Sequence, residues 1–352
     1  MASTVTKTAG TKSILTPSMT LKGHWSKITC LSYFPDGQRM ISGSLDRTVQ
    51  QWDLKAGKEI EEARGVSEEG ALVEVSRNGR WVATAIAGWP DNEEVCHGAE
   101  LKTCEVETGI VKTFKGHSRS VSCIDMSEDN TRMASGSLDR TARIWNIDTG
   151  ELVAGPFKSK DHVGAVRFSP DSKKLAVLSW TSKSLEVWDV QSQKLDVKVG
   201  EHDRLGDTHP PVFWTKNNKN IIAVFRFTKV NDNTTIYEFD GSTLKTVGTP
   251  FEGHTDRVTG LALSFDDALI ASASLDKTIK LWAFESRQLL ASFDVQHVFL
   301  LVLSPDSRQL AYTTLTGTRV GHTICICDTP PEILAQARVR ILPKPLCVLF
   351  VY

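Results

Sequence analysis

One cassette occurs three times in this chain with the same internal spacing. Each copy contains a Gly-His pair, a Ser-x-Ser-Leu-Asp segment and a Trp, with 22 residues from the His to the Asp and 6 from the Asp to the Trp. The three copies are His24, Asp46 and Trp52; His117, Asp139 and Trp145; and His254, Asp276 and Trp282. Because a repeat of fixed length folds as one unit that stacks on its neighbours, this feature restricts the fold more than any other. It also favours an interaction surface over an active site, since each copy serves the same structural purpose.

The gaps between the copies predict further, weaker repeats. His24 and His117 lie 93 positions apart, and His117 and His254 lie 137 apart. These distances correspond to two and three units of about 45 residues. Aligning the strand that carries the Trp gives the series Trp52, Cys104, Trp145, Trp188, Tyr237, Trp282 and Cys327. We therefore expect seven repeats, which occupy nearly all of the 352 residues and leave no room for a second domain.

Each unit is predicted to form four short β-strands. In the third repeat, apolar segments at 121–126, 132–137, 141–147 and 152–157 are bounded by Gly, Asp, Asn and Ser, which is typical of strands. Turn sequences such as Pro35-Asp36-Gly37 fall between the first two strands of their unit. No sustained apolar period of 3.6 residues precedes Pro330, and a short helix is expected only afterwards, at 332–340.

The Gly-His, Ser-x-Ser-Leu-Asp and Trp signals, repeated about every 45 residues, resemble those of the WD-repeat family of β-propellers. The resemblance covers residues 14–328. The resemblance implies an all-β, seven-bladed β-propeller of four-stranded antiparallel blades. It also implies that an N-terminal strand, at about 14–22, closes the ring beside 322–328, because an open ring would leave two unpaired strand edges. We thus expect a flexible segment at 1–13, the propeller at 14–328 and a C-terminal tail at 329–352.

The resemblance further implies a structural role for the nine cassette residues. In the family, the Asp of a tight turn bonds to the His, and the hydrogen-bond chain continues through a Ser to the Trp indole. The alternative, Ser/His/Asp catalysis, requires one exposed nucleophile beside an oxyanion site, and three equivalent copies fit a scaffold better. The weak repeats depart from this pattern. In the fourth, Ser159 stands at the His position and Ser182 at the Asp position.

Partner contacts in the family concentrate at the mouth of the central channel. They come from residues that enter each first strand and from the position before each turn Asp. The corresponding residues are Trp25, Lys27, Leu45, Leu138, Lys160, His162, Trp180, Arg257, Leu275 and His297. This mixture of apolar and cationic side chains suits a protein or peptide that carries an apolar anchor and acidic neighbours.

Two repeats contain long insertions, at about 87–100 and 226–233. Long connections in a compact domain are either functional or disordered. The first insertion includes Trp89 and an acidic run at 91–94, and an exposed Trp is a favoured interface anchor. Trp89 is therefore a candidate contact residue. The alternative is that its ring packs against its own blade.

Composition argues against several classes of protein. A net charge of −1, from 41 basic and 42 acidic residues, does not provide the excess of positive charge that nucleic-acid binding requires. The longest apolar runs, at 298–303 and 346–352, fall short of the roughly 20 residues that span a bilayer. Without a secretory signal, and with seven cysteines in no regular framework, the chain is expected to have free thiols inside the cell, in the cytoplasm or nucleus.

No cofactor or metal is predicted. Cys325 and Cys327 share a strand face near His322, but zinc generally takes three or four protein ligands. An enzyme with a site in the central channel would need His or carboxylate side chains on the innermost strands. Those segments are mostly apolar apart from Asp125 and Arg167.

We therefore predict a non-catalytic scaffold that assembles other proteins, with a channel enzyme as the alternative from another class. A second alternative is a substrate receptor of a ubiquitin ligase. Such receptors carry Trp-Asp-x-Arg, and the nearest match, Trp52 to Lys55, has Lys where bidentate bonding favours Arg. The apolar end at 346–352 could lie against a blade, extend a strand edge or contact a partner.

Overall fold

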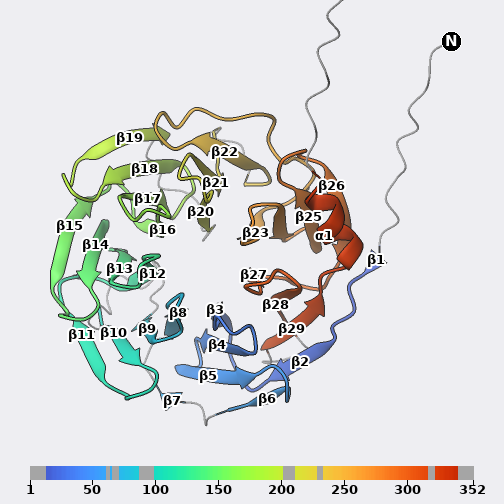
Figure 1. The fold of residues 1–352 in the computed structure, drawn as a ribbon, viewed down its shortest axis with the longest axis horizontal. Coiled ribbons are helices and arrows are strands. Elements are labelled where there is room, and N and C mark those ends of the chain that lie inside the picture. Colours follow the sequence, from blue (N-terminus) through green and yellow to red (C-terminus); the bar gives the residue numbers. More distant parts are fainter. Residues whose placement is uncertain are drawn as a thin grey trace, which may run out of the picture.

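Seven β-sheets surround a central axis in the computed structural model, and their order around the ring follows the chain (Figure 1). The structure describes residues 13–60, 64–65, 71–86, 99–200, 211–227, 233–315 and 322–339. This arrangement confirms the all-β, seven-bladed propeller that the repeat period predicts. Apart from one short parallel pair at the edge of blade six, neighbouring strands in each blade run antiparallel, starting from an inner strand near the axis.

Blades one to four follow the predicted order of strands. Blade one contains β3 (Ile28–Tyr33), β4 (Arg39–Ser44), β5 (Thr48–Asp53), β6 (Lys58–Glu59) and β7 (Arg64–Gly65). Blade two contains β8 (Ala71–Val75), β9 (Trp81–Ile86), β10 (Leu101–Glu105) and β11 (Val111–Phe114). Blade three contains β12 (Val121–Met126), β13 (Arg132–Ser137), β14 (Thr141–Asn146) and β15 (Leu152–Lys158). Blade four contains β16 (Val163–Phe168), β17 (Lys174–Ser179), β18 (Ser184–Asp189) and β19 (Leu195–Gly200).

The remaining blades vary more. Blade five contains β20 (Val212–Trp214), β21 (Asn220–Val224) and β22 (Ile236–Asp240). Blade six contains β23 (Val258–Leu263), β24 (Leu269–Ser274), β25 (Thr278–Ala283), β26 (Leu289–Asp294) and β1 (Ser13–Ile14). Blade seven contains β27 (Leu301–Leu303), β28 (Gln309–Leu315), β29 (His322–Asp328) and β2 (Met19–Lys22).

Blade five departs from the predicted four strands. The part of it that the structure describes has three strands, and only two isolated bridges, Ile236 to Phe251 and Phe239 to Thr246, mark the outer position. The intervening chain contains Gly248, with a φ of 65°, and Pro250, which has no N–H to donate. A continuous ladder therefore cannot form there.

The N-terminal segment closes the ring as predicted, but it divides between two blades. Met19 pairs with Ile326 and Lys22 with Thr323, so β2 forms the antiparallel outer strand of blade seven. β1 instead pairs in parallel with β26, and Ile14 lies opposite Asp294 in blade six. The closing strand is thus shorter than the predicted 14–22.

The turn between the inner and second strands has the same backbone form in all seven blades. One residue of each turn has a positive φ, between 55° and 72°, a region that favours Gly, Asn and Asp. These residues are Gly37, Gly79, Asn130, Ser172, Asn218, Asp267 and Ser307. In six blades a Ser or Thr hydroxyl also donates to the Asp or Asn two positions later, at 2.6–2.8 Å. A Ser/Thr-x-Asp/Asn motif therefore identifies even the repeats that lack Gly-His.

Two faces of the ring follow from this topology. We call the face at which the inner strands begin the upper face. The turns between the second and third strands also lie there, because the N–H of Leu45 donates to the carbonyl of Lys27 at 2.8 Å and that of Leu275 to Arg257 at 2.9 Å. We call the opposite face, which carries the turns of the preceding paragraph, the lower face.

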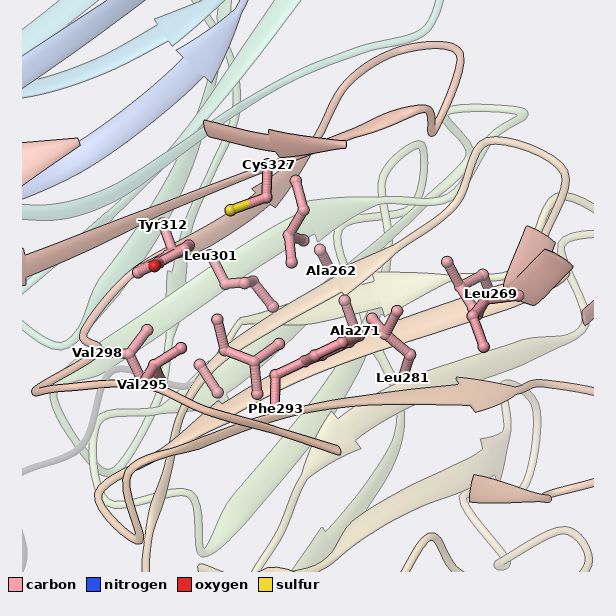
Figure 2. Close-up of a cluster of buried hydrophobic side chains, with 14 of the residues drawn as sticks. Ala262, Leu269, Ala271, Leu281, Phe293, Val295, Val298, Leu301, Tyr312 and Cys327 are labelled. Carbon is pink, nitrogen blue, oxygen red and sulfur yellow. The ribbon is translucent and has the colours of Figure 1, made fainter. Parts of the chain in front are cut away.

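Apolar side chains fill the seams between neighbouring blades. Figure 2 shows the seam between blades six and seven, where Leu281 and Phe293 lie across from Leu301 and Tyr312. The helix α1 (Pro331–Ala337) adds three apolar side chains to this cluster, so the predicted short helix forms and is anchored to blade six. No helix in the described ranges is long and apolar enough to cross a membrane.

Candidate interaction face

Each full cassette builds a hydrogen-bonded network beneath the upper face. In blade one, Nδ1 of His24 lies 2.8 Å from Oδ2 of Asp46, and its Nε2 lies 2.7 Å from Oγ of Ser42. The indole N–H of Trp52 donates to the same Oγ at 2.8 Å. With a proton on Nδ1 of His24, every polar atom in this chain has a partner, which is the condition for burying such groups.

The networks in blades three and six have nearly the same dimensions. His117 and His254 each lie 2.8 Å from their Asp and 2.8 Å from their Ser, and the Trp indoles donate at 2.8 and 2.9 Å. The three bridging serines, Ser42, Ser135 and Ser272, are fully buried. A substrate cannot reach a buried hydroxyl, so these Ser/His/Asp sets do not have the geometry of a catalytic triad.

The Asp of each network also fixes the surrounding backbone. In blade one, Oδ1 of Asp46 accepts from the N–H and hydroxyl of Thr48, and Oδ2 accepts from the N–H of Trp25 at 3.0 Å. Burial alone would raise the pKa of Asp46, but the hydrogen bonds from His24 and Thr48 outweigh it and lower the pKa to about 2. The carboxylate therefore stays charged at neutral pH and holds the loop of Trp25 against the turn.

Blade four replaces this network with a different one. The predicted substitute, Ser159, donates to Glu186 at 3.3 Å, and the indole of Trp188 donates to the other oxygen of that carboxylate at 3.3 Å. Lys198 pairs with Glu186 at 2.7 Å. Ser182 has a positive φ of 56° at its turn. Sequence reasoning missed Glu186, although a Glu two residues before the strand Trp was the available signal.

Most of the predicted contact residues are accessible on the upper face. Trp25 is 61% exposed, and Leu275 is 40% exposed despite its apolar side chain. Lys160, Arg257 and His297 are also exposed. Three more are half-buried: Lys27, Leu45 and His162.

Two predicted contact residues are corrected by the structure. Leu138 and Trp180 are each only 3% exposed, so neither side chain can meet a partner in this conformation. The loop before β16 accounts for this burial, because its His162 contacts both residues. The ring of His162 bonds to the carbonyl of Leu138 at 2.6 Å, and the N–H of Trp180 donates to the carbonyl of His162 at 2.9 Å. Trp89 lies outside the described residues.

The inner strands link consecutive blades through polar side chains that line up around the ring. Oγ of Ser32 accepts the N–H of Val75 in the next blade at 3.3 Å. Asp125 accepts the N–H of Phe168 and pairs with the guanidinium of Arg167, both at 2.7 Å. Sequence reasoning noted these two charged residues in inner strands, and the structure shows that they bond to each other.

Glu74 occupies the corresponding position in blade two and was not noted from the sequence. Burial raises the pKa of its carboxyl group to about 7, although the positive charge of Arg167 opposes this rise and the negative charge of Asp125 adds to it. Among the described residues, no group of three or more His, Cys, Asp or Glu side chains could hold a metal ion. The five described cysteines form no disulfide.

The family described as "WD domain, G-beta repeat" matches this chain at residues 15–53, 109–146 and 244–283, which contain the three full cassettes. An uncharacterized WD repeat-containing protein of Schizosaccharomyces pombe is 30% identical over 54% of this chain and 52% of its own length. Periodic tryptophan protein 2 of Saccharomyces cerevisiae is 29% identical over 52% of this chain and 23% of its own length.

A third similar protein is cell division cycle 20.1, cofactor of APC complex, of Arabidopsis thaliana. It is 22% identical over 72% of this chain and 54% of its own length. The chain thus spans less than two thirds of the length of each of these curated relatives.

Proposed function

Since the chain belongs to the WD-repeat family, we propose that it is a non-catalytic scaffold that holds other proteins on the upper face of its propeller. The observation that carries this proposal is Trp25, a large aromatic side chain on the upper face that is 61% exposed. Exposed Trp residues of this kind are enriched among the anchors of protein interfaces.

The support beneath Trp25 makes it a suitable anchor. Its backbone N–H is fixed by Asp46, which in turn is held by His24 and Thr48. A side chain on a rigid loop loses little backbone freedom when a partner binds, so more of the contact energy remains as affinity. The same arrangement fixes the loops of His117 and His254, because the N–H of the following residue in each bonds to the network Asp at 3.0 Å.

The absence of an exposed nucleophile in the three networks supports the non-catalytic part of the proposal. Relatives support the assembly part, since one of them is named as a cofactor of the APC complex. Free thiols in the described part of the chain are consistent with a reducing compartment inside the cell.

Affinity purification followed by mass spectrometry tests this function. We expect the tagged wild-type chain to retain specific proteins that the double variant Trp25→Ala/Arg257→Glu loses. The matched control is Phe265→Ala/Lys55→Glu, which removes an aromatic side chain that is 65% exposed and reverses a charge on the lower face. Loss of the same proteins from the control, or their retention by the upper-face variant, would show that the upper face is not the binding surface.

A further inference from the structure

Three segments of the upper face meet at the boundary between blades three and four. The N–H of Leu138 donates to the carbonyl of Ser120 at 3.0 Å, and that of Ser159 to the carbonyl of Arg140 at 2.9 Å. His162 then bonds to the carbonyl of Leu138 at 2.6 Å. The loop before β12, the turn before β14 and the loop before β16 are therefore held together as one surface.

This surface carries a concentration of basic side chains. Arg140 and Lys160 are exposed, and Arg119 is half-buried. Burial lowers the pKa of His162, its bond to Leu138 opposes this, and the positive charges of Arg119 and Arg140 lower it further. We call Arg119, Arg140, Lys160 and His162 the basic cluster.

Three arginines of the lower face are in a different electrostatic situation. There, Arg77 pairs with Glu128 and Arg80 with Glu105, each at 2.6 Å, and Arg338 pairs with Asp266 at 2.7 Å. By contrast, Arg119, Arg140 and Lys160 have no ion-pair partner within the described residues. Two carboxylates adjoin the cluster in the sequence: Asp139 precedes Arg140 and is bonded to His117 at 2.8 Å, and Asp161 follows Lys160 and is buried.

We propose that the basic cluster binds a carboxylate-rich segment of a partner protein. This inference rests on the proposed function and specifies the chemistry of the partner. Guanidinium groups without an ion-pair partner attract carboxylates, which they can bind in a bidentate manner. Such complementary charge gives specificity and a faster association rate.

A nucleic acid fits the basic cluster less well than an acidic protein segment. Single-stranded nucleic acids bind where aromatic side chains offer their faces to the bases, and the aromatic residue adjoining this cluster, Trp180, is buried. Duplex binding requires an extended positive surface, whereas this chain has a net charge of −1.

The test uses the full chain and a fluorescein-labelled peptide of ten glutamates, followed by fluorescence anisotropy at low and physiological salt. We expect saturable binding that weakens as salt rises, and no binding of the matching peptide of ten glutamines. The double variant Arg119→Glu/Arg140→Glu should weaken binding of the glutamate peptide at least about tenfold. Lys173→Glu/Lys194→Glu is the matched control, because it reverses two exposed charges in lower-face turns of blade four.

Each outcome has a defined meaning. Equal binding by the cluster variant and the wild-type chain would overturn the proposed site. A labelled decanucleotide that competes more strongly than the glutamate peptide, or a phosphoserine peptide that binds more than tenfold more tightly, would overturn the carboxylate assignment. If the cluster variant loses the peptide while Trp25→Ala/Arg257→Glu retains every copurifying protein, the cluster stands and the Trp25 anchor fails. The reverse pattern refutes the cluster alone.

Discussion

The Glu74 carboxyl gives the propeller a dependence of stability on pH that one substitution can isolate. This group lies on an inner strand near Arg167 and Asp125, and burial is the main cause that raises its pKa from an ordinary 4.5 to about 7. A carboxyl group with a higher pKa in the folded chain stabilises that chain fully below the unfolded pKa. The contribution is lost as pH rises through 7.

The size of the effect follows from the shift. At about 1.4 kcal/mol per pKa unit, a rise from 4.5 to about 7 corresponds to an upper limit of about 3 kcal/mol above pH 7. The Glu74 side chain is only half-buried, so water screens its charge and reduces this limit. We therefore expect an effect on the free energy of unfolding of about 1–2 kcal/mol. Glu74→Gln keeps the shape of the side chain but cannot ionise, so it should gain stability relative to wild type as pH rises.

Urea unfolding of both chains at pH 5.0 and pH 8.5 measures this effect. The free energy of unfolding of Glu74→Gln, minus that of wild type, should increase by about 1–2 kcal/mol between the two pH values. Other titrating groups are common to both chains and cancel in the difference. Glu107→Gln, in an exposed lower-face turn of blade two, is the control and should show no such increase. A difference for Glu74→Gln that stays constant from pH 5.0 to pH 8.5 would refute the reasoning.

Three further predictions concern the polar contacts and the closure of the ring. Asp139→Ala should reduce the free energy of unfolding by about 1–3 kcal/mol, because it leaves His117 without its partner, and a double-mutant cycle with His117→Ala that shows no coupling would contradict the network. Asp125→Ala should cost about 3–5 kcal/mol in urea unfolding, since it leaves the partly buried Arg167 unpaired, whereas conversion of both residues to apolar ones should restore part of the loss. Deletion of 1–22 should lower the melting temperature sharply, and deletion of 1–12, which retains β1 and β2, is its control; equal melting temperatures would argue against closure by β2.

The sequence predicted the ring because its strongest signals are both local and repeated. Three cassettes at fixed spacing imply a repeating unit, and the measured gaps determine where the weak units belong. The repeated turn at Gly37, Asn130 and the other five positions would have identified the weak blades more directly. Turn sequences such as Pro35-Asp36-Gly37 indicate only some of these positions, because the residue with positive φ is Gly, Asn, Asp or Ser in different blades.

The exposure of the contact residues could not be predicted in the same way. Leu138 and Leu275 occupy the same position in two nearly identical cassettes, yet one is buried and the other is 40% exposed. The two positions differ in the next blade, where His162 bonds to the carbonyl of Leu138 while His297 is exposed. Burial at this position is set by a loop 24 residues further along the chain, in a repeat whose own sequence has diverged.

Glu186 shows a second limit of pattern reasoning. Alignment of the repeats places Ser159 at the position of the missing His in blade four. It cannot show that the acceptor for the Trp indole is now Glu186, which lies on the third strand of the blade. A buried Trp indole requires some acceptor, and either a Ser or a Glu satisfies that requirement. The physical constraint is retained while the residue that meets it changes.

The pairing of β2 with β29 also determines when this chain can finish folding during its synthesis. Met19 and Ile326 lie at nearly opposite ends of the described chain, so the partner of β2 is made long after β2 itself. At about 5–20 residues per second, a ribosome needs about 15–60 s to add the residues between them. For that time β2 has no partner strand to pair with, and blade seven is not yet formed. A strand of only four residues that ends in Lys22 is a poor template for pairing with other chains, which lessens the risk of aggregation during this interval.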